Sequence, residues 1–390
     1  MHAVRDAALK IILALKNAAL ITLSLCAAAR PVAASAAPPT LADFWDGRAE
    51  FVTDVLQTGQ PMGESDTLLR SDGTLWSYVH ASYRSAFVTD SCGAPVEFPG
   101  CVVIYTSIDQ GRSFRLPENP VCLIPCGECP CVSETDHTDQ QQYPRIFVDG
   151  KQTWMVYEFH GGVYLRSSKD GLTWSMPIHV ADSAVWMLLH RPCISPESIG
   201  PHPHITTHFD CLRGGPPGIF VDSGVIYVFI AQGQNPGAIG CFARRVDRPR
   251  APFVACKYNP LFIGAPSYGD HDAKDASANP FFDFRMISSA DVHMLGTKKE
   301  RRFYMLYEGV RGPGRDDPGD TQFGLGLARS TTDAIDGPWE KFPGNPILVD
   351  MPGNIGLGHA DLVVMNSITY LYTSLNGWTR GRLELRWKAG

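Results

Sequence analysis

Short apolar and aromatic runs, each followed by a polar turn and a second such run, recur along most of the chain. In the clearest pair, apolar positions alternate through 291–295 and again through 302–307, with the charged segment 296–301 between them. A period of two predicts strands, and a short polar segment between two strands predicts a hairpin. In an antiparallel hairpin, Asp291 and Glu308 lie at the same end. The pattern therefore brings two carboxyl side chains together.

This strand, turn and strand unit occurs five times. The units begin at nearly even intervals, near Asp66, Arg145, Gly218, Asp291 and Asp361. Repeats of this length and pattern predict a radial fold in which each unit forms one blade of a β-propeller. The segments 107–114 and 168–174 also resemble Asp-boxes, which are structural turns. We therefore predict an all-β fold, a five-bladed β-propeller over residues 41–390.

The last unit is too short to complete its blade alone. After Asp361 the chain has room for three strands, of which the last runs through 383–387. An open edge would expose unpaired backbone groups. We therefore expect the segment 49–54 to supply the missing outer strand, so that an N-terminal strand closes the ring.

Composition agrees with this fold and limits the classes of molecule that the protein can bind. Hydrophobic residues make up 44% of the chain and charged residues 19%, and 37 glycines and 30 prolines supply many turns. The net charge of −6 offers no basic surface for nucleic acid. A glycan or another small neutral or cationic substrate suits this charge. We expect a monomer or a weak homo-oligomer.

The N-terminus has the pattern of a secretory signal peptide over residues 1–37. Arg5 and Lys10 precede an apolar run through 11–29, and small residues at 32–37 offer cleavage sites. Lys16 interrupts the apolar run, which makes it short for a membrane-spanning helix. We expect a secreted or periplasmic protein with no stable membrane anchor after processing. A retained anchor is the alternative.

Cysteines and two polar clusters raise the question of bound metals. Cleavage would remove Cys26 and leave ten cysteines, and an even number in an exported chain predicts disulfides. Four cysteines in 122–131 leave a zinc site open, although their spacing is uneven. His202, His204 and His208 offer a second zinc alternative, or a rim loop that stacks on sugar, and the acidic segment 270–275 offers a calcium alternative.

The topology predicts where the chemistry lies. Innermost strands of a propeller start at one face around the axis, so the residues that open the five units should meet there. The second strands of the units end at the same face, at His80, Glu158, Gln232, Glu308 and Ser374. Several carboxylates with an arginine suit the cleavage of glycosidic bonds: one carboxylic acid protonates the leaving oxygen, and another activates water or attacks the anomeric carbon.

These residues resemble the five-bladed propeller glycoside hydrolases of families 43, 32, 117 and 130. Asp66, followed by apolar residues and the turn at 72–73, resembles the first-blade strand that carries the general base in families 43 and 117. The Gly-x-Gly-His turn at 356–359 resembles a last-blade turn. Its histidine lies near the axis in family 43, often beside a metal ion, and is implicated as the acid in family 117. The resemblance implies that a structural Ca²⁺ could bind at the axis, with no cofactor required for catalysis.

The chain also departs from these families. Arg145 stands where family 43 has its second-blade aspartate, and no Glu-Gly-Pro acid motif precedes Gly218 in the third blade. The acids lie in blades one, four and five, which is closer to family 117. The Asn-Asp-Pro-Asn signature of fructan-cleaving enzymes is absent. A sialidase would need an arginine triad and six blades, so the Asp-boxes alone favour that alternative weakly.

We predict four catalytic residues, with no catalytic metal: Asp66, Asp291, Glu308 and His359. Asp66 would be the general base or nucleophile, Asp291 would orient the sugar or tune a neighbouring pKa, and Glu308 or His359 would be the acid. Each has a structural alternative. Asp66 could cap a turn, Asp291 could bond backbone amides near the axis, and Glu308 could pair with an arginine at the rim.

Six further residues are predicted to bind substrate: Arg145, Glu158, His160, Gln232, Asp361 and Trp378. Arg145 could instead neutralise the acids and lower their pKa values. Trp186, His190 and Trp378 lie in expected loops, where they could stack on sugar or pack. The predicted function is a secreted glycoside hydrolase that acts on a polysaccharide or its oligomers. The alternatives are a non-catalytic glycan-binding propeller and a sialidase-like hydrolase.

Overall fold

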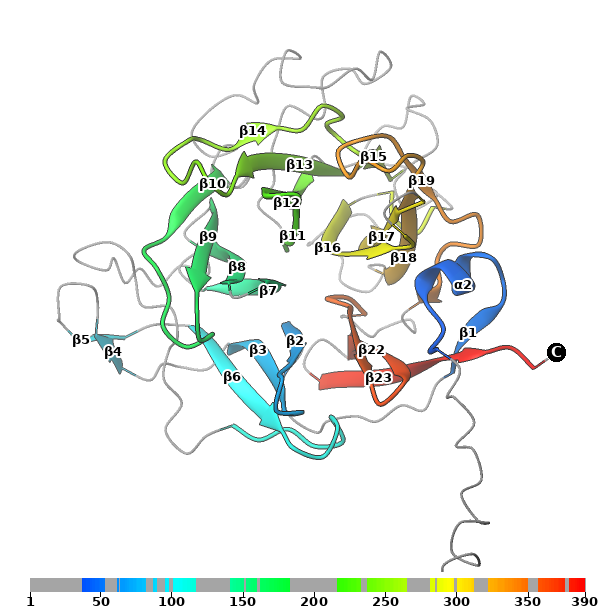
Figure 1. Cartoon of the computed structure of the whole chain (residues 1–390), viewed down its shortest axis with the longest axis horizontal. Coiled ribbons are helices and arrows are strands. Elements are labelled where there is room, and N and C mark those ends of the chain that lie inside the picture. The colour runs from blue at the N-terminus through cyan, green and yellow to red at the C-terminus, as the bar shows by residue number, and fades with distance from the viewer. Residues whose placement is uncertain are drawn as a thin grey trace, which may run out of the picture. The chain divides into compact units, whose positions relative to one another are not determined.

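Five antiparallel sheets stand around one central axis in the computed structural model of the chain (Figure 1). The structure describes residues 37–52, 62, 64–81, 87–89, 95–97, 101–116, 141–150, 152–159, 162–182, 216–232, 237–264, 281–284, 286–297, 300–311, 322–349, 357–375 and 379–389. The chain divides into Met1–Pro38 and Pro39–Gly390, and the blades belong to the second unit. The prediction of a five-bladed β-propeller is confirmed.

Blades 1 to 4 run outward from the axis in chain order, and blade 5 takes its outermost strand from the N-terminal part of the chain. Blade 1 contains β2 (Ser65–Leu69), β3 (Leu75–Ala81) and β6 (Cys101–Ser107). Blade 2 contains β7 (Gln142–Asp149), β8 (Gln152–Phe159), β9 (Gly162–Ser168) and β10 (Ile178–Asp182). Blade 3 contains β11 (Gly218–Asp222), β12 (Val225–Gln232), β13 (Ala238–Arg245) and β14 (Val254–Ala255), and β15 (Phe262–Ile263) also pairs with β13.

The fourth and fifth blades follow the same plan. Blade 4 contains β16 (Met286–Leu295), β17 (Arg302–Arg311), β18 (Gln322–Ser330) and β19 (Trp339–Lys341), and β20 (Leu348–Val349) also pairs with β18. Blade 5 contains β21 (Asp361–Met365), β22 (Ile368–Leu375), β23 (Thr379–Trp387) and the N-terminal β1 (Ala49–Val52). A separate hairpin consists of β4 (Phe87–Thr89) and β5 (Pro95–Glu97).

An N-terminal strand closes the ring, as the short last unit predicts. β1 pairs antiparallel with β23, with Phe51 opposite Leu385. The short helix α2 (Leu41–Trp45) precedes β1, and a capping box at Thr40 fixes its start. Leu41 is buried beside blades 4 and 5. The closing strand is therefore anchored both by its hydrogen bonds and by apolar packing.

Apolar side chains fill the space between neighbouring blades. Buried clusters join blades 1 and 5, blades 3 and 4, blades 2 and 3, blades 4 and 5, and blades 1 and 2. A central strand such as β12 is covered on both faces: the neighbours Val228, Phe229 and Ile230 point alternately to the two faces, and all three are fully buried. This burial explains the nearly continuous apolar runs in the sequence.

The two Asp-box segments form structural turns at the outer side of blades 1 and 2. In the second, the N–H groups of Leu172 and Thr173 donate to Oδ1 of Asp170 at 2.8 Å and 2.7 Å. Tyr78 of blade 1 donates its hydroxyl to the carbonyl oxygen of Gly171 at 3.2 Å. The turn therefore holds one blade against its neighbour, which gives this motif a structural role.

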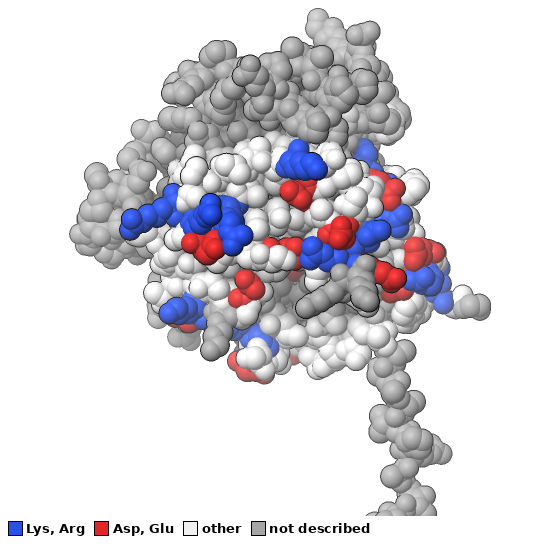
Figure 2. Space-filling view, turned by 45° about the horizontal axis from the view of Figure 1, so that its top comes forward, with Lys and Arg blue, Asp and Glu red and all other residues white. Residues whose placement is uncertain are grey.

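The described surface carries charges of both signs. Basic and acidic side chains lie beside one another on the face in Figure 2. Exposed ion pairs include Arg245 with Asp247 at 2.8 Å and Arg329 with Glu340 at 2.6 Å. Exposed pairs of this kind contribute at most about 1 kcal/mol each. Within the described residues, no helix is both long and apolar enough to span a membrane.

Candidate active site

The innermost strands β2, β7, β11, β16 and β21 surround the axis (Figure 1). Their first residues meet at one face, as the contacts between blades at Asp66, Asp291, Asp361 and Gly218 show, and in each blade the next strand returns antiparallel. We call the face at which these five strands begin the upper face. The second strands β3, β8, β12, β17 and β22 end there. The side chains that both sets bring to the axis form the candidate site.

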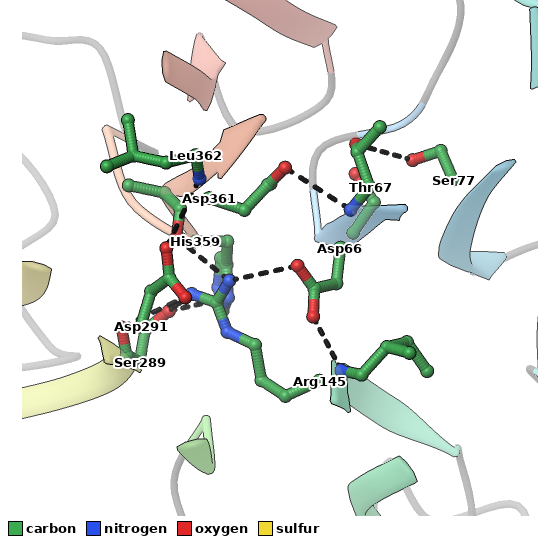
Figure 3. A network of polar contacts seen from close by, with 12 residues as sticks. Asp66, Thr67, Ser77, Arg145, Ser289, Asp291, His359, Asp361 and Leu362 are labelled. Atoms are coloured by element: carbon green, nitrogen blue, oxygen red, sulfur yellow. Dashed lines mark hydrogen bonds and ion pairs between the residues drawn. The ribbon is translucent and has the colours of Figure 1, made fainter. Parts of the chain in front are cut away.

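Arg145 of β7 lies at the centre of this site (Figure 3). Its Nη1 donates to the carbonyl oxygen of Ala360 at 2.8 Å and lies 3.7 Å from Oδ1 of Asp66. Its Nη2 donates to Oγ of Ser289 at 2.6 Å and to the carbonyl oxygen of Ser289 at 3.2 Å. One guanidinium thus connects blades 1, 2, 4 and 5. The side chain is only 3% exposed.

Three aspartates of the innermost strands bind the backbone of the next blade around the ring. The amide donors and their acceptors are Ile146 to Asp66 Oδ2 at 2.5 Å, Leu362 to Asp291 Oδ2 at 3.2 Å and Thr67 to Asp361 Oδ2 at 3.2 Å. We call these contacts the inter-blade latches. They join blade 1 to blade 2, blade 4 to blade 5 and blade 5 to blade 1.

Blade 3 meets blade 4 differently. A Cβ atom at Gly218 would collide with the carbonyl oxygen of Ala290. The backbones approach directly there, and the N–H of Ser289 donates to the carbonyl oxygen of Pro216 at 2.8 Å. Glycine is therefore required at the position where the other blades carry Asp or Arg.

A second arginine, Arg380, supports the fifth blade. Arg380 of β23 is fully buried, forms an ion pair with Asp361 and donates to the carbonyl oxygen of His359 at 2.6 Å. Burial lowers the pKa of Arg380 to about 9, with Arg145 adding to this effect. Asp361 is thus held by one arginine and one backbone amide, which indicates a structural role for it.

Three residues with left-handed backbone conformations lie together at the site, with His359 in contact with the other two. Tyr143, Ser289 and His359 have φ values of 56°, 54° and 47°. Each stands two positions before the residue that opens its unit, and bulges interrupt β7 and β16 at the first two. Tyr143 and His359 stack with their rings 5.1 Å apart, and Ser289 Oγ lies 3.2 Å from His359 Nδ1. Such conformations of non-glycine residues concentrate at functional sites.

Glu308 lies in the last part of β17, beside this group. It stands opposite Ser288, whose Oγ donates to Glu308 Oε1 at 3.1 Å. Its Oε2 lies 3.9 Å from His359 Nε2. A Cβ at Gly358 would collide with this carboxyl group. Asp291 and Glu308 do lie at the same end of the hairpin, but the bulge places Ser288, not Asp291, directly across from Glu308.

The environments of the carboxyl groups push their proton affinities apart. Burial raises the pKa of Glu308 to about 7, and the negative charge of Glu64 adds to this rise. Burial also raises the pKa of Asp66 to about 6, although Arg145 opposes it. For Asp291 burial acts in the same direction, but the charge and hydrogen bond of His293, at 2.6 Å, outweigh it and leave its pKa below its usual range.

His359 is held in its neutral form. Burial lowers its pKa well below the usual range, and the positive charges of Arg145 and Arg380 lower it further. A neutral imidazole has no acidic proton to give near neutral pH. Of the two residues that sequence reasoning offered as the acid, Glu308 is therefore the one whose environment retains a proton.

Sequence reasoning left several residues of the site unassigned: Glu64, Tyr143, Ser288, Ser289, His293 and Arg380. Glu64 is bound by His80, whose Nδ1 forms a short hydrogen bond with Glu64 Oε2. Glu64 stands two positions before Asp66, as His359 does before Asp361. Strand alternation gives no signal for Tyr143, Ser289 and His359, because bulges or left-handed backbone interrupt the alternation there.

The other predicted residues are Glu158 and Gln232, on β8 and β12, and a set that lies outside the described residues. Glu158 is half-buried at the end of β8. The backbone of Gln232 ends β12, but its side chain is not among the described ones. His160, Trp186, His190, Trp378, the histidines at 202–208, the acidic segment 270–275 and the cysteines of 122–131 all lie outside the described residues.

The axis does not suit the calcium ion that the family resemblance implied. Ca²⁺ requires six to eight oxygen ligands. The carbonyl oxygens of Ser289 and Ala360 already accept hydrogen bonds from Arg145, and that of His359 accepts one from Arg380. Within the described part of the chain, no group of three or more His, Cys, Asp or Glu side chains is placed to hold a metal ion.

Comparison with known proteins identifies the fold. The chain matches no protein-family model and no curated protein sequence. The solved structure of "Bacteroides ovatus Xyloglucan PUL GH43B" is 15% identical, with a TM-score of 0.50 over 87% of this chain and 55% of that chain. A structure from the GH130 family, reported with glycoside hydrolases that target β-1,2 mannosidic linkages in Candida mannan, is 13% identical, with a TM-score of 0.50 over 91% and 92% of the two chains.

A third solved structure, xylan β-1,4-xylosidase from Bacillus halodurans, is 16% identical, with a TM-score of 0.49 over 86% of this chain and 54% of that one. The present chain thus spans about half the length of the xylosidase and of the GH43B protein. At these identities the likeness establishes the fold that this chain shares with five-bladed propeller glycoside hydrolases.

Proposed function

We propose that this chain is a glycoside hydrolase whose active site lies at the upper face of the propeller axis. One observation carries the proposal: Glu308, a buried carboxyl group whose pKa is raised to about 7, lies in one network of side-chain contacts with carboxyl groups of blade 1. Glycosidic cleavage requires a carboxylic acid that keeps its proton and a carboxylate that has lost it. The known functions of proteins with the same fold agree with this chemistry.

Glu308 is the proposed general acid. Its carboxyl group is 5% exposed and is oriented by Ser288 and by the adjoining imidazole of His359. Near neutral pH a large fraction of Glu308 carries a proton that can pass to the leaving glycosidic oxygen. His359 would position this group and would not exchange a proton with substrate.

The second carboxylate of the proposed reaction comes from blade 1, which brings both Glu64 and Asp66 to the axis. Arg145 would serve as a positioning residue. Its guanidinium is buried and bound to Ser289, Ala360 and Asp66. This arrangement favours the neutralising role that we considered for Arg145 over binding of a substrate carboxylate.

Export would fit the proposed substrate, because polysaccharides are met outside the cell. A disulfide joins Cys241 and Cys256. Disulfides persist in oxidising compartments. Together with the signal-peptide pattern of residues 1–37, this bond supports a secreted or periplasmic location.

A specific observation also favours a glycan-binding propeller without turnover. The latches give Asp66, Asp291 and Asp361 a structural reason to stand at the axis. If their role is purely structural, hydrolysis depends on Glu308 and one further carboxylate. The two functions differ in one measurable property, the release of reducing sugar.

A screen of the purified chain against a broad panel of polysaccharides and oligosaccharides tests the proposal, with released reducing ends as the readout. Glu308→Gln should retain glycan binding and lose turnover. Glu50→Gln changes an exposed residue of β1 and is the matched control, with turnover unchanged. If wild type and both variants bind glycans and none of them releases sugar, the proposed function becomes a glycan-binding propeller.

A further inference from the structure

We propose that Glu64, held by His80, is the general base that works opposite Glu308, and that Asp66 is a structural residue of the ring. This inference rests on the proposed hydrolase function and deepens it. It changes the assignment that the family resemblance gave to the first blade, where Asp66 would be the base. Accessibility, local contacts and the latches carry the argument.

Glu64 is the most accessible of the five carboxyl groups described at the site. Its side chain is 27% exposed, compared with 10% for Asp66, 18% for Asp291, 3% for Asp361 and 5% for Glu308. A base that removes a proton from water needs an open approach from solvent as well as contact with the substrate. Among these five groups, Glu64 meets that need best.

His80 fixes Glu64 through two contacts. Its backbone N–H donates to the carbonyl oxygen of Glu64 at 2.9 Å, which extends the pairing of β2 with β3 by one residue. Its ring Nδ1 forms a short hydrogen bond with Oε2 of Glu64. The His80 side chain is 8% exposed. A buried imidazole that orients a carboxylate restricts its rotamers and keeps it ready to act.

Asp66 has much less freedom to react. Its Oδ2 accepts the amide of Ile146 at 2.5 Å, and its Oδ1 faces Arg145 at 3.7 Å. Asp291 and Asp361 make the same latch contact with their neighbouring blades. A residue whose geometry repeats at three blade boundaries is explained by ring assembly. Attack by Asp66 on a substrate would require it to release Ile146.

Glu64 and Glu308 belong to one group of contacts at the upper face. The ring of His80 lies 6.2 Å from that of Tyr143, and Tyr143 stacks on His359 at 5.1 Å. His359 Nε2 in turn lies 3.9 Å from Glu308. The negative charge of Glu64 also contributes to the raised pKa of Glu308. Two carboxyl groups that influence each other in this way suit an acid and base pair.

The proposed step balances as a hydrolysis. Glu64 accepts a proton from a water molecule while the water oxygen forms a bond to the anomeric carbon. The bond between that carbon and the glycosidic oxygen breaks, and Glu308 gives its proton to the departing oxygen. Afterwards Glu64 loses its proton to solvent and Glu308 regains one, so that no other reactant is consumed.

The test compares Glu64→Gln, Glu64→Ala and Asp66→Asn on the substrate that the wild-type chain cleaves. Loss of a general base lowers kcat by roughly 10²- to 10⁴-fold. Both Glu64 variants should show this loss, with the urea midpoint of Glu64→Gln close to that of wild type because its amide can still bind His80. Sodium azide should restore turnover to Glu64→Ala, with a glycosyl azide as product. Asp66→Asn should lower the urea midpoint and retain most of its kcat while folded.

Two outcomes would overturn the inference in different ways. Full activity in both Glu64 variants, with loss of turnover in a stable Asp66→Asn, would return the base to Asp66 and leave the hydrolase function intact. An inactive wild-type chain would remove the proposed function and this inference with it. The wild-type assay therefore separates the two failures.

Discussion

The backbone N–H of Ile146 donates to Oδ2 of Asp66 at 2.5 Å, across the boundary between the first and second blades. The two residues are 80 positions apart in the chain. The same contact between an opening aspartate and the following strand of the next blade recurs at Asp291 and Asp361. Aspartates that look catalytic in sequence therefore also hold the ring together, and the two roles must be separated by experiment.

The latch at Asp361 is expected to be the most costly to break. Asp361→Asn would remove the carboxylate that pairs with the fully buried Arg380. Loss of one partner of a buried ion pair costs roughly 3–5 kcal/mol, because the remaining charge stays buried. Urea unfolding should show this decrease, and Asp149→Asn, at an exposed position of β7, should change little. A difference below about 1 kcal/mol for Asp361→Asn would argue against the latch.

The raised pKa of Glu308 predicts how stability depends on pH. Its carboxyl pKa rises from 4.5 to about 7 on folding, mainly through burial, so the folded chain binds this proton more tightly than the unfolded chain. The stabilising effect is fully present below pH 4.5 and is lost as pH rises through about 7. The unfolding free energy of Glu308→Gln minus that of wild type should therefore increase as pH rises from 5 to 8. An equal difference in urea unfolding at both pH values would contradict this account.

The closing strand can be tested by truncation. A chain that starts at residue 54 lacks β1 and α2, exposes the edge of β23 and removes Leu41 from its apolar cluster. It should unfold at a clearly lower temperature than the full chain, or aggregate through the open edge. A chain that starts at residue 38 retains both elements and is the control. Equal melting temperatures for the two truncations would show that β1 is dispensable.

The disulfide between Cys241 and Cys256 should stabilise blade 3. It links residues 15 positions apart, and a loop of that length corresponds to a gain of about 3 kcal/mol in the chain-entropy account. The double variant Cys241→Ser and Cys256→Ser should lose stability by about this amount in non-reducing urea unfolding. In dithiothreitol, wild type and the double variant should share one midpoint. A double variant as stable as the oxidised wild type would contradict the prediction.

The sequence was sufficient to predict the blades, because each is specified locally by alternating apolar residues and a polar turn, as in 291–307. The meeting of Asp66, Arg145, Asp291 and Asp361 followed from topology, since all innermost strands begin at one face. The start of β16 was less predictable. It begins at Met286, five positions before Asp291, because the strand continues through a bulge with Ser289 in a left-handed conformation.

The chemistry of individual carboxyl groups was the part that sequence could not provide. Whether an aspartate oxygen is bound by an amide depends on a contact such as that of Thr67 with Asp361, 294 positions apart. Burial of Glu308 and the exposure of Glu64 depend likewise on side chains from several blades. A pattern along the chain identifies candidates for the site, and only their surroundings distinguish a latch from an acid.

The most direct test of the central claim is the pH dependence of kcat/KM for wild type and Glu308→Gln. It is measured on two substrates: the natural glycan, and an aryl glycoside of the sugar that the screen identifies. With a good leaving group the reaction needs little acid assistance, so Glu308→Gln should retain turnover there and fail on the natural glycan. On the natural glycan, wild-type kcat/KM should fall above about pH 7, where Glu308 loses its proton. The assignment of Glu308 as the acid would be contradicted if Glu308→Gln cleaved the natural glycan at the wild-type rate and kcat/KM showed the same decline at high pH.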